Sequence, residues 1–128
     1  MKNLKARGKI SNGNWVYGVI KSFSPCEIEL PNGDVYSVNI NSLCLYTGIK
    51  DHNGKEIYEN DTISAVYFGD EIRGYVKWGE KVGGWVWSNY FQDLVSDFIP
   101  ELVVIGNTFD NPTLLSYENR PWGIKMNN

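Results

Sequence analysis

Residues 45–63 read LYTGIKDHNGKEIYENDTI, and the rest of the chain can be understood as strands arranged around this stretch. Residues that suit a reversal of the backbone alternate in it with apolar residues that suit burial. The first group is Gly48, Asn53, Gly54 and Asn60, and the second is Leu45, Ile49, Ile57 and Ile63. The stretch is therefore predicted to be a turn-rich connector with buried anchors.

Two hairpins are predicted before this stretch. Residues 4–10 and 15–23 have the composition of strands and are joined by Ser11-Asn12-Gly13-Asn14, whose residues favour turns. Residues 26–30 and 36–40 alternate between apolar and polar side chains on either side of Asn32-Gly33. Because Asn-Gly tolerates two positive φ angles, a type I′ turn is expected there.

A third hairpin is predicted after the stretch. A strand over 62–68 leads into strands over 72–78 and 85–91, which are joined by a loop over 79–84. If the loop is symmetric, Trp78 pairs with Trp85 and Val76 with Trp87, which places three tryptophans on one face. Large aromatic side chains bury the most area, so this face is interpreted as the core.

The last part of the chain carries the only helical signals. Phe91, Leu94, Val95 and Phe98 recur at the spacing of one helix face and precede Pro100, which predicts a short helix near 91–99. An apolar strand is expected over 102–105, and Asn111-Pro112 indicates a short helical turn near 112–115. Residues 116–128 form a polar tail.

This order of elements predicts a mainly β fold. Short antiparallel strands with little helix favour a small β-barrel, because closure hides the edges of the sheet. A chain of 128 residues suits one domain, expected over 1–115 and followed by the tail over 116–128. No apolar run is long enough to span a membrane, and the start of the chain lacks the pattern of a secretory signal. A cytoplasmic location is therefore expected.

Several blocks of sequence, in a fixed order, resemble the YopX-like family of small prophage-encoded proteins. They are Arg7-Gly8-Lys9, Trp15-Val16-Tyr17-Gly18, Tyr46-Thr47-Gly48, Lys50-Asp51, Asn53 to Glu59, Asp61, Val76 to Trp78, Val104 to Asn107, Asn111-Pro112 and Leu114-Leu115. The resemblance implies a phage or prophage origin, a small barrel of the Src-homology-3 type and assembly into oligomers. It implies no particular activity. This chain has Asn60 where the family usually has glycine, and asparagine is the next best residue for a left-handed backbone.

Carboxylates gather in the 45–63 stretch, so a metal or acid–base site has to be weighed. They are Asp51, Glu56, Glu59 and Asp61. A structural role is favoured because Asp51 and Asp61 can each accept hydrogen bonds from the backbone of their own turn. The spacing also departs from that of a Ca²⁺-binding loop. A metal-assisted hydrolase using Asp51, Glu59 and Asp61 is the third-ranked hypothesis.

Other catalytic signals are missing from the sequence. His52 is the only histidine and is expected to be exposed at a hairpin tip. Neither a phosphate-binding GxxxxGK[ST] loop nor a GxSxG nucleophile motif occurs. We therefore expect no enzyme activity, no cofactor and no metal. Cys26 and Cys44 are interpreted as two buried free thiols rather than as one disulfide.

Two surfaces are candidates for binding. Arg73, Tyr75 and Lys77 alternate on one face of the third hairpin, with Tyr90 across from Arg73, and such a face could hold phosphates while bases stack. Residues 1–26 carry five basic residues and no acid, which indicates either a nucleic-acid contact or a solvated edge strand. Trp122 in the tail is expected to dock on its own barrel or on a neighbouring chain.

The first-ranked hypothesis for function is a non-catalytic protein-interaction module. Its expected partners are a host or phage protein and further copies of the same chain. The second hypothesis is a small nucleic-acid-binding barrel that uses the basic and aromatic strand face.

Overall fold

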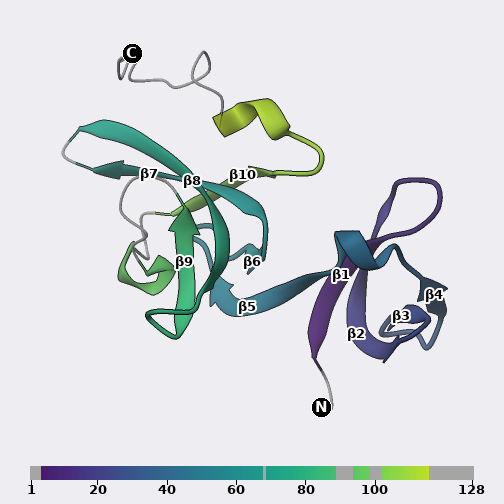
Figure 1. The fold of residues 1–128 in the computed structure, drawn as a ribbon. Coiled ribbons are helices and arrows are strands. Elements are labelled where there is room, and N and C mark those ends of the chain that lie inside the picture. The colour runs from purple at the N-terminus through teal and green to yellow at the C-terminus, as the bar shows by residue number, and fades with distance from the viewer. Residues whose placement is uncertain (1–3, 68, 89–93, 99–101, 116–128) are drawn as a thin grey trace. The chain divides into compact units, whose positions relative to one another are not determined.

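The computed structural model describes residues 4–67, 69–88, 94–98 and 102–115 (Figure 1). Antiparallel strands dominate it, and the helices among the described residues are short 3₁₀ turns. The prediction of a mainly β fold is confirmed. The strand pairing orders two sheets without establishing a closed barrel, so the barrel and its Src-homology-3 type stay predictions.

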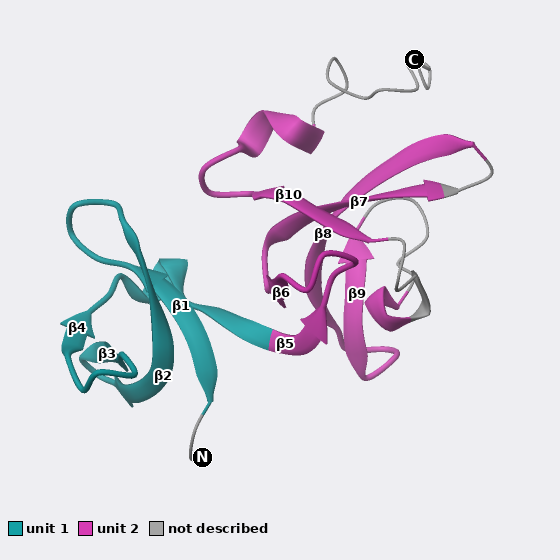
Figure 2. Cartoon of the chain, turned by 180° about the vertical axis from the view of Figure 1, so that it is seen from behind, with its two compact units in different colours: residues 1–46 teal, residues 47–128 magenta. Residues whose placement is uncertain are grey.

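The chain divides into two compact units, residues 1–46 and residues 47–128 (Figure 2). The boundary falls inside strand β5 (Cys44–Lys50), which therefore contributes residues to both units. Two compact units can still fold and unfold together as one domain, so the single domain expected over 1–115 stays a prediction. The tail over 116–128 lies outside the described residues.

Unit 1 contains four complete strands, a 3₁₀ turn and the beginning of β5. They are β1 (Lys5–Lys9), β2 (Trp15–Phe23), β3 (Cys26–Glu29), β4 (Val35–Ser37) and η1 (Ile40–Ser42). The strands lie in the order β4-β3-β2-β1-β5, all antiparallel to their neighbours. Ala6, Cys26, Ile28 and Val38 form the buried core of this unit.

Strand β2 lies between β1 and β3 and pairs with one of them along each edge, and its ladder with β3 is irregular. Its first half pairs with β1, its second half pairs with β3, and the register shifts between Ile20 and Ser22. At Gly18 the backbone of β3 leaves no room for a side chain, since an added β-carbon would be 2.1 Å from the backbone oxygen of Glu29. Glycine therefore allows the close approach of the two strands at this position.

The Asn32-Gly33 turn differs from the expected type I′ geometry. In the turn before β4, the amide of Gly33 donates to the Leu30 carbonyl (2.9 Å), and Gly33 has a positive φ of 96°. Asn60 is the only described non-glycine residue with positive φ, so Asn32 does not adopt the second positive angle of a type I′ turn. The type I′ prediction is wrong. Pro31 fixes a negative φ that suits the first central position of an ordinary turn, which moves the turn one residue upstream and leaves glycine to close it.

Unit 2 contains the end of β5, five further strands and two 3₁₀ turns. They are β6 (Glu56–Tyr58), β7 (Asp61–Tyr67), β8 (Asp70–Gly79), β9 (Gly84–Ser88), η2 (Val95–Phe98), β10 (Val103–Asn107) and η3 (Pro112–Leu115). The sheet order is β10-β7-β8-β9. The buried core on one face of this sheet consists of Ile57, Ile63, Ala65, Val76, Trp87, Val95 and Leu102.

The helical predictions have two outcomes. The helical turn near 112–115 is confirmed by η3. Of the helix predicted near 91–99, the structure describes residues 94–98, and these form the 3₁₀ turn η2 instead of an α-helix. Leu94 forms an isolated β-bridge with Val86, so the backbone just before η2 is extended. Nothing among the described residues is a helix of the length and hydropathy that crossing a membrane requires.

The β8–β9 hairpin has the predicted register, with Trp78 opposite Trp85 and Val76 opposite Trp87. The interpretation of its tryptophan face as core is only partly correct. Trp87 is 4% exposed and belongs to the core, but Trp78 is 48% exposed at the end of the hairpin. Trp78 lies outside the core because the hairpin extends beyond the elements that cover this face of the sheet.

A candidate interaction surface on the β8–β9 hairpin

The predicted turn motif has mainly structural duties. Gly48, Gly54 and Asn60 have positive φ angles of 83°, 83° and 70°, so the left-handed backbone predicted at Asn60 is confirmed. The buried side chain of Asp61 accepts a hydrogen bond from the Tyr58 amide at 2.7 Å. It therefore holds the turn between β6 and β7 together, with Asn60 at its centre.

Asp51 is also buried and binds backbone groups with both carboxylate oxygens. Its Oδ1 accepts hydrogen bonds from the amides of Asn53 (2.8 Å) and Lys55 (2.9 Å). Its Oδ2 accepts one from the amide of Val104 in β10 (2.9 Å). The carboxylate thus closes the turn between β5 and β6 and fastens it to β10. Within the part of the chain that the structure describes, no three acidic, histidine or cysteine side chains gather as metal ligands would.

Three residues of the predicted binding face, Arg73, Tyr75 and Lys77, lie on one face of β8. Arg73 is tied into the fold, with Nε at 3.0 Å from Oε2 of Glu71 and Nη1 donating to the Leu114 carbonyl at 3.1 Å. Glu71 also accepts a hydrogen bond from the Ser64 hydroxyl. Tyr75 and Lys77 lie further along the same face of β8 and are partly buried. Tyr90 and Trp122 lie outside the described residues.

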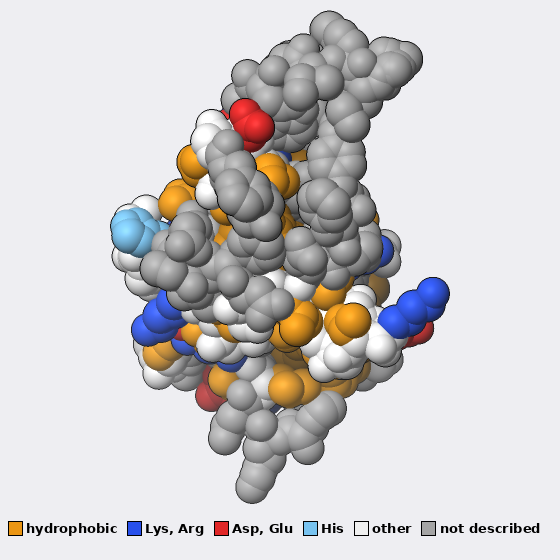
Figure 3. All heavy atoms as spheres, turned by 90° about the vertical axis from the view of Figure 1, so that its left-hand side faces the viewer, with side chains coloured by type: hydrophobic (Ala, Val, Ile, Leu, Met, Phe, Trp, Pro, Cys, Tyr) orange, Lys and Arg blue, Asp and Glu red, His pale blue; other side chains and the backbone are white. Residues whose placement is uncertain are grey.

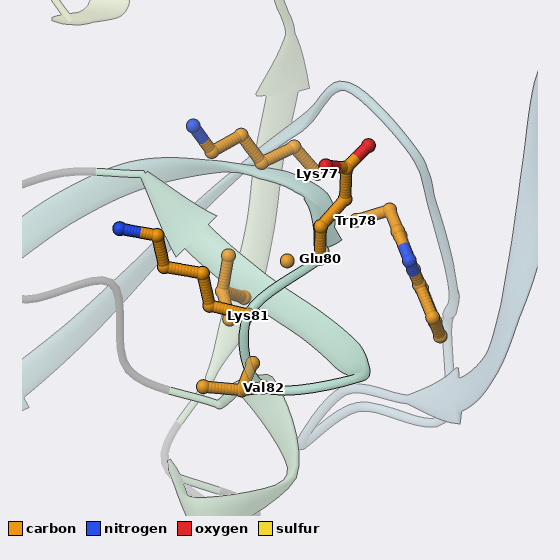
Figure 4. Close-up of a pocket in the computed structure, with 7 residues that line it drawn as sticks. Lys77, Trp78, Glu80, Lys81 and Val82 are labelled. Atoms are coloured by element: carbon orange, nitrogen blue, oxygen red, sulfur yellow. The ribbon is translucent and has the colours of Figure 1, made fainter.

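Lys77 instead belongs to a hollow at the end of the hairpin (Figure 4). The hollow has a volume of about 550 Å³. Its lining residues come from the end of β8, the loop and β9, namely Lys77, Trp78, Gly79, Glu80, Lys81, Val82 and Val86. In Figure 4 the side chains of Lys77 and Lys81 extend to the same side, and Trp78 lies on the other.

Local contacts order the loop that forms the hollow. The amide of Gly83 donates to the Gly79 carbonyl at 2.8 Å, which closes the loop. A β-carbon on Gly79 would lie 2.9 Å from Val86 and 3.0 Å from Val82, so glycine leaves room for both valines. The Trp78 ring meets Trp85 edge-on, with centroids 5.3 Å apart and an interplanar angle of 80°. These contacts hold the surface in shape before any partner binds.

We define the hairpin surface as Lys77, Trp78, Lys81 and Val82. It combines two exposed apolar side chains, Trp78 at 48% and Val82 at 56%, with two ammonium groups. An exposed tryptophan is typical of protein-binding sites, where it often contributes much of the binding free energy. Sequence reasoning missed Trp78, Lys81 and Val82 as binding residues. One sequence feature could have indicated the loop as a binding site, namely the apolar residue Val82 in a glycine-rich turn.

The remaining candidate side chains are placed as follows. His52 is exposed, as expected, and the histidine coloured pale blue lies at the surface in Figure 3. Cys26 and Cys44 are free and buried, and burial raises the pKa of the Cys26 thiol. In unit 1 the cationic groups of Arg7 and Lys9 lie 4.6 Å and 5.1 Å from the centroid of the Trp15 ring. Part of the basic cluster of residues 1–26 therefore packs on aromatic rings.

These features define a mainly β protein of two antiparallel sheets with an exposed aromatic and basic hairpin end. The chain belongs to the YopX protein family, whose family model matches residues 11–116. The resemblance inferred from the ordered sequence blocks is confirmed. No curated protein matches the chain.

Proposed function

We propose that this YopX-family protein is a non-catalytic protein-interaction module that binds a partner through the hairpin surface. The observation that carries the proposal is the exposure of Trp78 (48%) at the end of β8 and of Val82 (56%) in the following loop, which is closed by its own backbone hydrogen bond. Burying such side chains against a partner releases the free energy of apolar desolvation at little cost in loop ordering.

The chemistry of the hairpin surface suits an apolar segment that carries carboxylates. Lys77 and Lys81 outnumber Glu80 around the hollow, so a partner with negative charge is favoured. The family resemblance supports a phage or prophage origin and hence a host or phage protein as the partner, met in the host cytoplasm. Nucleic acid is the second candidate, and the bond from Arg73 to the Leu114 carbonyl weakens it, because this cation is already engaged in the fold.

A finer description of the fold also belongs here. We propose that unit 1 closes as a small barrel of the Src-homology-3 type. The strand order β4-β3-β2-β1-β5 and the single 3₁₀ turn before β5 support this proposal. So do two approaches of the segment after β4 to β1. The amide of Asn39 donates to the Lys9 carbonyl at 2.9 Å, and an added β-carbon on Gly8 would lie 2.9 Å from Val38.

The proposed partner site is tested by affinity capture from host and lysogenic cells with two substitutions, Trp78→Ala and Lys81→Glu. Both are expected to reduce capture of the partner at least about tenfold, since each removes a central contact of the surface. Val66→Ser is the matched apolar control, because Val66 is 63% exposed on β7 of the same unit. Lys55→Glu is the matched charge control on an exposed lysine.

Thermal unfolding of each variant separates a lost contact from a lost fold. The proposal fails if Trp78→Ala and Lys81→Glu, both folded, capture the partner as well as the controls do. Capture that disappears on nuclease treatment and falls steeply with salt would instead identify nucleic acid as the ligand.

A further inference from the structure

The outer edge of the unit 1 sheet is formed by β4, and Figure 2 shows this strand at the margin of the unit. All three of its residues, Val35, Tyr36 and Ser37, are exposed, and none of them is charged. Natural proteins commonly protect an edge strand with lysine, proline, a bulge or a covering segment. Strand β4 is short but carries none of the first three protections. The chain approaches β1 only after β4, where the Asn39 amide donates to the Lys9 carbonyl, and Val35, Tyr36 and Ser37 stay exposed.

The register shows which backbone groups of this edge point outward. Val38 donates its amide to Cys26, and Asp34 accepts from Leu30, so residues 34, 36 and 38 face β3. In an antiparallel ladder the neighbouring residues face the other way. The amides and carbonyls of Val35 and Ser37 therefore point away from the sheet, and no described residue forms a hydrogen bond with them.

These outward groups are self-complementary. If two β4 strands pair antiparallel with Tyr36 opposite Tyr36, Val35 of each copy faces Ser37 of the other. Each Val35–Ser37 pair across the two copies is then a hydrogen-bonded pair. Every outward amide of these residues has a carbonyl of the other copy as its acceptor. The two Tyr36 rings meet at the non-hydrogen-bonded position, where cross-strand side chains are closest.

The same register is favourable at its ends. It places Asp34 of one copy opposite Val38 of the other, so that no like charges face each other. Val38 lines a hollow of about 500 Å³ whose only charged lining residue is Lys9. The acidic residue of each copy is thus brought beside the hollow that Lys9 lines on the other copy. Pairing ends there, because the Asn39 amide already donates to the Lys9 carbonyl.

We infer that β4 is a self-association edge, through which two copies of this chain form an isologous dimer with a continuous intermolecular sheet. Only residues 34–38 of each copy take part, so the dimer is weak and concentration-dependent. This inference concerns unit 1 and is independent of the hairpin surface.

The test is sedimentation equilibrium of the full chain from about 10 µM to about 1 mM, a range in which a weak dimer dissociates. The double variant Val35→Lys/Ser37→Lys places ammonium groups opposite each other at both pairs and is expected to raise the dimer dissociation constant at least about tenfold. The matched variant Val35→Lys/Ser37→Glu places opposite charges there and is expected to retain the dimer. Both change exposed side chains only, and thermal unfolding verifies that each variant is folded.

A second readout reports the register. Tyr36→Cys puts two thiols at a non-hydrogen-bonded pair, where a disulfide can form, so mild oxidation is expected to give a covalent dimer. His52→Cys, also exposed but outside unit 1, is the control and is expected to stay monomeric. The inference is overturned if the chain is monomeric throughout the range, if the two double variants dissociate equally, or if Tyr36→Cys cross-links no faster than His52→Cys.

Discussion

Asn60 occupies a backbone conformation that most residues avoid. Its φ is 70°, its amide donates to the Val76 carbonyl at 2.8 Å, and its carbonyl accepts from the Thr108 amide at 2.9 Å. Hydrogen bonds on both sides of the residue therefore keep the turn between β6 and β7 in this conformation. The resembled family usually has glycine here, and asparagine tolerates the left-handed region better than other residues with a β-carbon.

The first prediction compares two substitutions at Asn60. Asn60→Gly is expected to leave the free energy of unfolding unchanged within about 1 kcal/mol or to raise it, because glycine adopts a positive φ without strain. Asn60→Val is expected to lower it by about 1–3 kcal/mol, because a β-branched side chain resists this region. Urea titration measures both. Equal stability of the two variants would show that the left-handed turn makes no energetic demand.

Single residues also show which features could be predicted from the sequence and which could not. The left-handed turn at Asn60 was predictable, because the residue type and its neighbours suffice to indicate a turn. The exposure of Trp78 was not, because it depends on how far the covering elements reach along the hairpin. Arg73 carries a positive charge in the sequence, but the Glu71 and Leu114 groups that engage it appear only once the strands are paired.

Among the strands, local patterns predicted pairing well and turn geometry less well. The alternation of residue types gave the register of Trp78 with Trp85 because both strands and their loop are contiguous in the chain. The type I′ prediction for Asn32-Gly33 failed because Pro31 competes for the position of the turn. Of the short helix predicted near 91–99, the described part is a 3₁₀ turn over Val95–Phe98, because the apolar spacing also suits an extended Leu94 followed by such a turn.

The second prediction concerns the attachment of the β5–β6 turn to β10. Asp51→Ala leaves three amides, those of Asn53, Lys55 and Val104, without their acceptor. We expect the free energy of unfolding to fall by about 3 kcal/mol, since each of these partly buried amides loses a hydrogen bond to a charged acceptor that contributes about 1 kcal/mol or more. Asp51→Asn is expected to lose less, because its amide oxygen can still accept the two bonds inside the turn.

Urea titration again provides the measurement, with Asp70→Ala as the control. Asp70 is an exposed carboxylate at the start of β8, so its removal is expected to change stability by no more than about 0.5 kcal/mol. If Asp51→Ala were as stable as Asp70→Ala, the Asp51 carboxylate would not fasten the turn. The bond to Val104 spans 53 residues of sequence, which is why no local pattern could indicate it.

Strand β5 contributes residues to both units. Strand β5 pairs with β1 through Cys44 and Leu45, and its later residues belong to unit 2. At Thr47, just past the boundary, the hydroxyl donates to the Ile57 carbonyl at 2.7 Å. Unfolding either unit removes partners from one half of this strand. We therefore expect the units to unfold together, in line with the single domain predicted from the length of the chain.

The last prediction tests this coupling with Gly18→Ala, which perturbs unit 1 alone. The added β-carbon would meet the Glu29 carbonyl oxygen at 2.1 Å, so the β2–β3 contact has to open. Native-state hydrogen exchange is followed at Ile28 in unit 1 and at Ile63 in unit 2, both fully buried. With one cooperative domain, exchange at both residues accelerates by the same factor, about 10- to 100-fold for a loss of about 1.4–2.8 kcal/mol. Ser22→Ala on the same strand is the control and is expected to leave both rates unchanged. Faster exchange at Ile28 with an unchanged rate at Ile63 would mean that the two units fold independently.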